Sequence, residues 1–341
     1  MTSDSLWKEI LEYGRWAPSP HNIQSWRFRI EDATTVTLLY DPERLLPDTD
    51  PSGRFCMVGF GILLELLSIA ASPHGLKVVA SYEFEDTYLD PKKVGLQPLA
   101  RLRLVQRDET EKESFDRQLI LDRRTSRLPY DDRPVAAPVL AELSAVAASY
   151  GHLLEFSSDP KDVAWIVRLN AETMFFDMSE PLSRNEVGSW IRYSRAEARR
   201  KADGLAAYAM NFPGWLMGLF VKHNWLFRIP GVYQFTRAVY IASMRGTRTV
   251  AWISGPFAVH EDWENTGRMM ARLWLTMTSH GVYLHPFGSV ITNGKAHKLM
   301  VDHFSDSAQK REHDLWMLVR LGHSDLPPKA WRMTLDQLLV D

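Results

Sequence analysis

The feature of this sequence that most constrains its fold is a long apolar stretch, Cys56 to His74, in which Glu65 is the only charged residue. Leucine, isoleucine and alanine fill every side of the helix that this stretch predicts. A helix that is apolar all round must be buried by other elements or by another subunit. The chain of 341 residues is long enough for about two domains of usual size, so we expect a large core around this helix.

A second predicted helix repeats the pattern of the first. The spacing Gly-x5-Leu-x6-His-Gly begins at Gly61 and recurs 206 residues later at Gly267. Glycine commonly ends helices, so chance is one explanation and an internal duplication is the other. The order of predicted elements also repeats, which favours duplication. We therefore predict two pseudo-symmetric halves, each with an antiparallel sheet, packed through helices 56–74 and 263–280.

The remaining elements follow from apolar periodicity and turn residues. Strands are predicted at 26–31, 35–41, 77–85, 99–106, 152–158, 249–255 and 314–322. Further helices are predicted at 138–151 and 162–178, with a charged helix at 109–121, and the helix of the repeat lies within 262–281. Residues 180–245 have no counterpart in the first half and contain three tryptophans among interrupted helical patterns. This region is predicted to be an insertion.

Charge and cysteine content exclude several classes of protein. The chain has 40 Lys and Arg against 42 Asp and Glu, a formal net charge of −2, so it lacks the basic field that nucleic-acid binding requires. Cys56 is the only cysteine and cannot form an intrachain disulfide, which favours a reducing compartment. The first residues do not resemble a signal peptide. We therefore expect a cytoplasmic protein.

One further stretch, Gly204 to Val221, has no charged residue but contains Asn211, Pro213 and Gly214 near its middle. Such an interrupted run is a poor membrane-spanning helix. We expect no stable membrane insertion, and interpret the stretch as an amphipathic lid or a partner-facing helix, with buried core as the alternative.

The first candidate site is a basic run that contains Arg123, Thr125 and Arg127. Guanidinium forks and hydroxyl groups are the donors that a phosphomonoester needs for its anionic oxygens. Basic residues at the end of a helix also complement the helix dipole, so a purely structural role is the alternative.

The second candidate is a loop in which Pro18, Ser19, Asn22 and Gln24 lie between Arg15 and Trp26. Prolines fix the backbone, and hydroxyl and amide groups can hydrogen-bond the edge of a planar heterocycle. The alternative is an ordinary turn in which the asparagine satisfies its own backbone.

The third candidate is the turn His285-Pro-Phe-Gly288-Ser289, where glycine permits close approach of a ligand to the backbone. The sequence lacks the Rossmann, P-loop, zincin, hydrolase and CxxC motifs. Histidines show no metal-ligand spacing, so no metal site is expected.

Together these motifs resemble the nitroreductase superfamily of FMN-binding flavoproteins. The family loop R-x-A-P-S-x-x-N-x-Q-P-W matches residues 15–26, with Ser25 where proline is usual, and the family phosphate motif R-x-[ST]-x-[RK] matches residues 123–127. The single-chain order of the motifs is most similar to the Acg-type branch, whose members bind flavin in an internally duplicated fold.

The resemblance implies an α+β, three-layer fold (also described as α/β) that is a fused pseudo-dimer. Residues 1–122 would form one nitroreductase-like half, and residues 123–341 the other, with the inserted lid at about 180–245. Each half would keep one of the two motifs, so one chain would build one complete site. A monomeric pseudo-dimer is therefore expected.

The resemblance also implies roles for individual residues. Arg123, Thr125 and Arg127 would hold the FMN phosphate, and Arg332 would be a fourth contact. The residues that would contact the isoalloxazine and ribityl groups from the other half are Pro18, Ser19, Asn22 and Gln24. Gly288 and Ser289 would place a backbone N–H near flavin N5.

Two functions fit this resemblance. The first is an FMN-dependent oxidoreductase that passes hydride through N5 to a small conjugated acceptor such as a nitroaromatic or a quinone, with NADH or NADPH as a transient donor. The second is a flavin storage or sequestration protein whose lid covers the flavin. The sequence does not identify the physiological substrate or donor.

Overall fold

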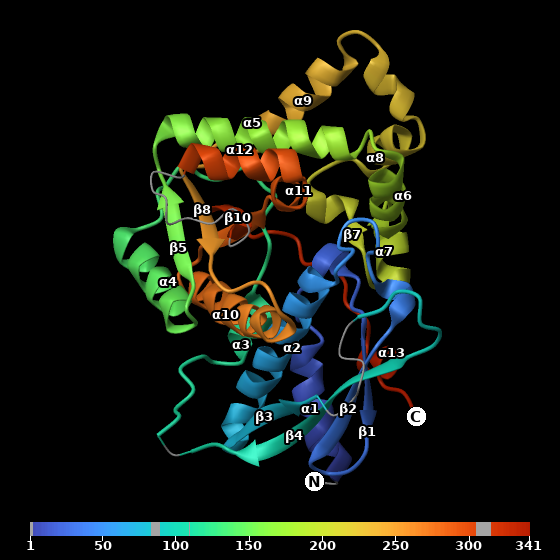
Figure 1. The fold of residues 1–341 in the computed structure, drawn as a ribbon, viewed down its shortest axis with the longest axis vertical. Coiled ribbons are helices and arrows are strands. Elements are labelled where there is room, and N and C mark those ends of the chain that lie inside the picture. The colour runs from blue at the N-terminus through green and yellow to red at the C-terminus, as the bar shows by residue number, and fades with distance from the viewer. Residues whose placement is uncertain (1–2, 83–88, 109, 305–314) are drawn as a thin grey trace.

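The computed structural model describes residues 3–82, 89–108, 110–304 and 315–341, and Figure 1 shows two sheets separated by a layer of helices. The first sheet has the spatial order β1 (Trp26–Ile30), β2 (Thr35–Tyr40), β4 (Gln97–Gln106), β3 (Leu76–Ser81). All neighbouring pairs are antiparallel. Helices α1 (Ser3–Gly14) and α2 (Arg54–Ala71) pack together, and α2 also packs against β3.

The second sheet has the spatial order β5 (Leu153–Ser157), β8 (Thr249–Ser254), β10 (Leu315–Gly322), β9 (Tyr283–Pro286), again antiparallel throughout. In both sheets the first, second, fourth and third strands of the chain lie side by side in that order. The two halves therefore share one strand order as well as one element order, α-β-β-α-β-β, once the helices between β5 and β8 and between β9 and β10 are set aside.

The second sheet is buried on both faces. Ala251 and Ile253 of β8 belong to the main core with α4 (Ala137–Ser149) and α10 (His260–Ser279). The alternate residues Val250 and Trp252 belong to a second apolar cluster. That cluster includes residues of α5 (Pro160–Asp177), α11 (Gly288–Thr292) and α12 (Gly294–Phe304). Helix, sheet and helix therefore form three layers in this half, as an α+β fold predicts.

The two apolar helices, α2 and α10, pack against each other at the centre of the molecule (Figure 1), as the sequence predicts. Residues 56–71 of α2 are all buried. A Cβ atom added to Gly61 would lie 2.1 Å from the carbonyl oxygen of Glu264 and 2.9 Å from the Cα of Gly267. The repeated glycines thus meet at one point, where the two backbones touch without side chains between them.

The C-terminal segment crosses from the second half to the first. After α13 (Leu335–Leu338), Leu339 forms a parallel bridge with Phe28 of β1. The N–H of Val340 donates to the carbonyl of Phe28 at 2.9 Å. This path carries the chain past the loop that follows α1.

Residues 180–245 are helical and interrupted, as expected. They comprise α6 (Pro181–Trp190), β6 (Ile191–Arg192), α7 (Arg195–Lys201), β7 (Leu205–Ala206), the short helix η4 (Ala207–Met210), α8 (Gly214–Lys222), the short helix η5 (Asn224–Arg228) and α9 (Val232–Ala242). The apolar run 204–221 is therefore divided among β7, η4 and α8. Figure 1 shows α8 and α9 at the end of the molecule opposite the first sheet.

The predicted helix 109–121 is wrong over most of its length. Only α3 (Gln118–Asp122) is helical, and residues 110–117 are not. The side chains of Asp108, Glu113 and Asp116 accept hydrogen bonds from backbone N–H groups one or two residues further along, which satisfies the backbone without a helix. Glu109 and residues 83–85 of the third predicted strand lie outside the described residues; β3 itself ends at Ser81.

Within the described residues, one helical stretch, Arg54–His74, is long and apolar enough to cross a membrane. Of the window that meets this criterion, 89% is buried inside the protein. The helix is therefore a core helix, as its contact with α10 requires.

Candidate functional site

The loop after α1 has an unusual backbone. His21, Asn22 and Gln24 all have positive φ, between 46° and 57°, a region that side-chain-bearing residues seldom occupy. The hydroxyl of Ser19 accepts a hydrogen bond from the Gln24 N–H at 3.0 Å and helps to hold this shape. Strained backbone of this kind is retained where surrounding contacts fix it, often at functional sites.

Gln24 fixes the loop to two other segments. Its amide nitrogen donates to the carbonyl of Ala202 at 2.9 Å, and its amide oxygen accepts from the N–H of Met333 at 2.9 Å. Pro18 and Ser19 pack against α2. A Cβ atom added to Gly59 of that helix would lie 3.6 Å from the Cα of Ser19 and 3.7 Å from the carbonyl oxygen of Pro18. Both ends of the Gln24 amide are therefore used within the chain.

Asn22 leaves one acceptor without a partner. Its Nδ2 donates to the carbonyls of Gly204 and Trp331, both at 3.1 Å. Its Oδ1 is buried and has no hydrogen-bond partner among the described residues. A buried carbonyl oxygen without a partner is costly, so this atom is suited to accept a hydrogen bond from a bound molecule.

Three basic residues, Arg123, Lys329 and Arg332, meet beside this loop, and we call them the cationic group. The guanidinium of Arg123 is buried, lies 4.4 Å over the Trp274 ring and donates to the carbonyl of Trp16 at 3.2 Å. Burial, together with the charges of Arg332 and Arg124, lowers the pKa of Arg123 to about 9.

The other two members are in a similar environment. Burial and the charge of Arg15 lower the pKa of Arg332 to about 10. Burial and the neighbouring arginines lower the pKa of Lys329 to about 8, and its ammonium lies 3.4 Å over the Trp16 ring. The Nε atoms of Arg123 and Arg332 have no hydrogen-bond partner among the described residues.

No member of the cationic group forms an ion pair with a described carboxylate. Buried cations that repel one another cost free energy unless an anion joins them. The arrangement therefore suits a ligand with more than one negative charge.

Arg127 lies in different surroundings from Arg123. It is near Arg320, Tyr130 and Tyr240, and burial is the main reason that its pKa is lowered. Its charge and burial lower the pKa of His21 to about 4, burial being the larger cause, so that imidazole is neutral at pH 7. No hydrogen bond or ion pair of the Arg127 side chain occurs within the described ranges of the chain. The two ends of the basic run thus face separate parts of the loop.

The basic run also lies beside the third candidate, the turn at residues 285–289. Thr125 forms a bridge with Leu284 of β9, and the N–H of Ser126 donates to the Leu284 carbonyl at 3.1 Å. The chain reaches Gly288 four residues later, at the start of α11. A Cβ on Gly288 would meet nothing within 4 Å. Ser289 hydrogen-bonds to Asp177, whose pKa is nevertheless raised because burial outweighs its hydrogen bonds.

The insertion contacts the loop directly. The N–H of Gly204 donates to the Asn22 carbonyl at 3.1 Å, and Tyr208 donates to the Lys329 carbonyl at 3.0 Å. A pocket of about 550 Å³ opens next to the cationic group. It is lined by Arg195, Ala196, Arg199, Tyr208, Pro328, Lys329 and Trp331.

The structure thus brings together most of the predicted residues. Ser19, Asn22 and Gln24 adjoin the C-terminal segment that holds Arg332, and Arg332 adjoins Arg123. No described contact joins these residues to Gly288 or Ser289. Sequence reasoning missed Lys329, although its position three residues before Arg332 in the same proline-rich segment was available as a signal. Among the described residues, no group of three or more His, Cys, Asp or Glu could hold a metal ion.

Comparison with known proteins gives partial matches. No family model matches the chain. Over 134 residues the chain is 33% identical to a Mycobacterium tuberculosis (strain CDC 1551 / Oshkosh) protein named "Putative NAD(P)H nitroreductase acg", which covers 39% of this chain and 38% of that protein. The chain is therefore similar, over part of its length, to a protein of that name. Its resemblance to the superfamily and to the Acg-type relatives is confirmed.

A second nitroreductase relative agrees with the first. "Putative NAD(P)H nitroreductase Rv3131" of Mycobacterium tuberculosis (strain ATCC 25618 / H37Rv) is 31% identical over 153 residues, which covers 43% of this chain and 40% of that protein. The chain therefore matches less than half the length of these curated relatives.

Solved nitroreductases align only loosely. The FMN and NADPH-dependent nitroreductase NfnB from a Sphigopyxis species, strain HMH, aligns with a TM-score of 0.38 and 15% identity over 66% of this chain and 96% of that chain. A TM-score this low carries no argument about the fold.

Proposed function

We propose that this protein is an FMN-binding oxidoreductase of the nitroreductase type. The observation that carries the proposal is the cationic group, which lies beside a strained loop and forms no ion pair with a carboxylate of the described residues. FMN has a dianionic phosphate at one end and a planar ring with carbonyl and N–H groups at the other. A relative named "Putative NAD(P)H nitroreductase acg" supports the proposed type of reaction.

The residues present fit the phosphate end of this cofactor. Arg123 and Arg332 each keep a buried Nε–H without a partner, and Lys329 adds a third positive charge. We assign the phosphate to these three residues, with Thr125 as a further predicted contact. Charge-assisted hydrogen bonds from guanidinium to phosphate are among the strongest in proteins.

The loop fits the ring end. Asn22 offers a buried Oδ1 that accepts a hydrogen bond, and Ser19 and Pro18 shape the loop around it. Gln24 acts as a positioning residue, because its amide joins the loop to Ala202 and Met333. Arg127 is proposed to contact the same cofactor beyond His21, away from the Arg123 end.

The remaining predicted contacts stay proposals. Gly288 is open enough for a ligand to approach its backbone closely, and Ser289 follows it in α11. Bound FMN supplies hydride transfer through N5, so the chain itself needs no side-chain acid or base. The chain binds the cofactor, orients it and excludes water. The proposed acceptor is a small conjugated molecule such as a nitroaromatic or a quinone, and the proposed donor is NADH or NADPH.

A storage role is the second candidate, and one observation favours it. Residues 202–208 of the insertion bond to Asn22, Gln24 and Lys329, so the insertion sits close to the proposed flavin. A fixed cover would keep a nicotinamide ring away from the flavin, whereas a cover that opens during turnover would admit it.

We also propose that the chain is a duplicated, fused pseudo-dimer with halves 1–122 and 123–341. The shared strand order of the two sheets and the contact of Gly61 with Gly267 support this. A monomeric protein is expected on this basis, and the single cysteine, Cys56, supports a reducing compartment such as the cytoplasm.

To test the function, the purified holoprotein is mixed anaerobically with NADH or NADPH, and the absorbance of the flavin is recorded over time. Rapid bleaching, with reoxidation by a quinone or a nitroaromatic, is the expected result. If dithionite bleaches the flavin but neither nicotinamide does, the reductase proposal fails and storage takes its place.

A further inference from the structure

The elements α8, η5 and α9 of the insertion lie toward the end of the molecule opposite the first sheet (Figure 1), and several of their large apolar side chains are exposed. We call this set of exposed side chains the distal face. Its members are Trp215 and Leu219 of α8, Trp225 of η5, Ile229, and Phe235 and Val239 of α9. Trp215 is 75% exposed and Phe235 is 69% exposed. Large apolar side chains gathered on one exposed region mark a binding surface more often than an ordinary one.

The outward face of α9 is largely apolar, with Gln234 as its exposed polar residue, which is the reverse of a usual surface helix. Its exposed positions include Phe235, Ala238, Val239 and Ala242, spaced three and four residues apart. The opposite face packs on α5, where Tyr240 accepts a hydrogen bond from Asn170 at 3.0 Å. The helix is therefore held from one side and presents its apolar side to the surroundings.

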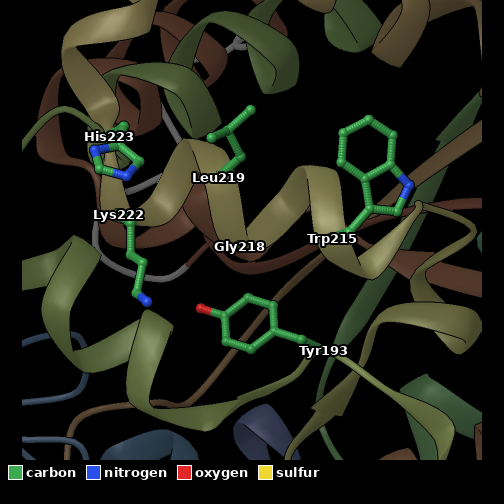
Figure 2. A pocket seen from close by; sticks show the side chains of 6 residues that line it. All are labelled: Tyr193, Trp215, Gly218, Leu219, Lys222 and His223. Carbon is green, nitrogen blue, oxygen red and sulfur yellow. The ribbon is translucent and has the colours of Figure 1, made fainter.

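Helix α8 repeats this arrangement. Figure 2 shows Trp215, Leu219 and His223 on the side of α8 away from Tyr193, while Lys222 points to the Tyr193 side. These residues line a pocket of about 530 Å³. Helix η5 packs against both α8 and α9 and so connects the two helices that carry most of these exposed residues.

The insertion does not need these side chains for its own core. That core is built from inward aromatic rings: Phe220 stacks on Phe227 at 4.7 Å, and Phe175 meets Phe227 and Tyr233 at 5.5 and 5.6 Å. The distal face is separate from this cluster. Packing within the chain therefore does not explain why the distal face is apolar.

Charge identifies the partner. Residues 204–260 contain five Lys and Arg but no Asp or Glu, although the whole chain has a net charge of −2. Lys222, at the end of α8, and Arg228, at the end of η5, are exposed and lie close in sequence to members of the distal face. Arg237 of α9 pairs with Glu172 of α5. Tryptophan, aliphatic and basic residues on one surface are the combination that binds anionic membrane surfaces.

We propose that the distal face binds peripherally to the surface of an anionic lipid bilayer. Trp215, Trp225 and Phe235 enter the boundary between headgroups and acyl chains, and Lys222 and Arg228 contact the anionic headgroups. The binding is reversible and involves no spanning helix. The proposal is independent of the proposed flavin chemistry, because the residues of the distal face are distinct from those assigned to FMN.

The experiment is flotation of the full-length protein with vesicles of phosphatidylcholine alone or of phosphatidylcholine mixed with phosphatidylglycerol. We expect binding to the anionic vesicles that weakens as salt is added, and little binding to the neutral ones. Trp215→Ser with Phe235→Ser should lower the affinity by at least about 10-fold. Lys222→Gln with Arg228→Gln should lower it by about 25-fold, at roughly fivefold for each charge.

The matched control is Leu326→Ser, since Leu326 is 72% exposed but lies outside the insertion. This variant should bind vesicles like the unaltered protein. Circular dichroism and thermal melting report whether each variant folds. The proposal is overturned if the protein ignores anionic vesicles, or if the Trp215/Phe235 variant binds as well as the control. It is also overturned if the protein dimerises without binding vesicles and these substitutions abolish the dimer, because the distal face would then bind a second copy.

Discussion

The α2–α10 contact and the cationic group both contain buried charged groups, but among the described residues only the first gives them partners of opposite charge. On the α2–α10 side, Glu65 pairs with Arg272 at 2.6 Å and with Arg268 at 3.5 Å, and Arg268 also pairs with Glu264 at 2.8 Å. In the cationic group, Arg123 and Arg332 have no such carboxylate. The charged groups of the first region find partners of opposite charge within the chain, and those of the cationic group do not among the described residues.

This difference separates structure from binding. A contact in which every charge has a partner stabilises the fold and needs no ligand to neutralise it. A buried group of like charges reduces stability, and natural proteins retain such a cost mainly where function needs it. The comparison therefore predicts that substitutions in the two regions will have opposite effects on unfolding and on ligand affinity.

The largest effect is expected at the helix contact. Gly61→Ala should lower the free energy of unfolding by about 3 kcal/mol or more, because the new methyl group would overlap backbone atoms of α10. Gly59→Ala is the matched control in the same helix, where a Cβ meets its nearest atoms at 3.6 Å. It should be neutral or stabilising by up to about 1 kcal/mol. Urea unfolding measures both, and equal stability of the two variants would contradict the close contact.

The cationic group should respond in the opposite way. Arg123→Ala should weaken FMN binding by about 10- to 150-fold, which corresponds to about 1.5–3 kcal/mol for a lost charged hydrogen bond. The stability of the flavin-free protein should stay the same or rise, because a buried charge without an anion is removed. Fluorescence titration with FMN and thermal melting of the apoprotein measure the two quantities.

Arg133→Ala is the control for this prediction. Arg133 is exposed and pairs with Asp131, so its loss should change neither quantity appreciably. If Arg123→Ala protein binds FMN as tightly as Arg133→Ala protein does, Arg123 does not hold the phosphate.

The smallest effect is a pH dependence. Lys329 has its pKa lowered to about 8, and a bound phosphate would favour its charged form. FMN affinity should therefore be highest near pH 7, where the phosphate is largely dianionic, and fall by roughly fivefold as the pH rises through 8, when the ammonium loses its proton. Lys329→Met should bind more weakly at pH 7 and remove this step. An unchanged step in the variant would assign it to another group.

Much of the fold could be predicted because apolar pattern determines it. The all-round apolar character of residues 56–74 predicts a buried helix, and the repeat at Gly267 predicts its partner. The failure at 109–121 has a local cause: charged residues suggested a helix, but there was no apolar face to hold one, and Asp108, Glu113 and Asp116 satisfy the backbone in turns. The sequence pattern does not show that acidic side chains will bond the backbone N–H groups in place of helical carbonyls.

The candidate site was less predictable because it is built from contacts far apart in the sequence. The meeting of Asn22 with Trp331 spans 309 residues, and that of Gln24 with Ala202 spans 178. The residue types in the loop indicated hydrogen bonding, but they could not show that Gln24 is satisfied by the chain while Asn22 keeps a free acceptor. The sequence likewise does not reveal which side of α9 packs against α5 and which side is exposed.

The most direct test of the account is the amount of FMN held by the purified chain. FMN released by denaturation is measured by absorbance and compared with the protein concentration, after the protein has been saturated with FMN and freed of excess. The account predicts a ratio near one for the unaltered chain and a reduced ratio for Arg123→Ala. A chain that holds no FMN, or one that holds close to two, would contradict a single site formed by the loop after α1 and the cationic group.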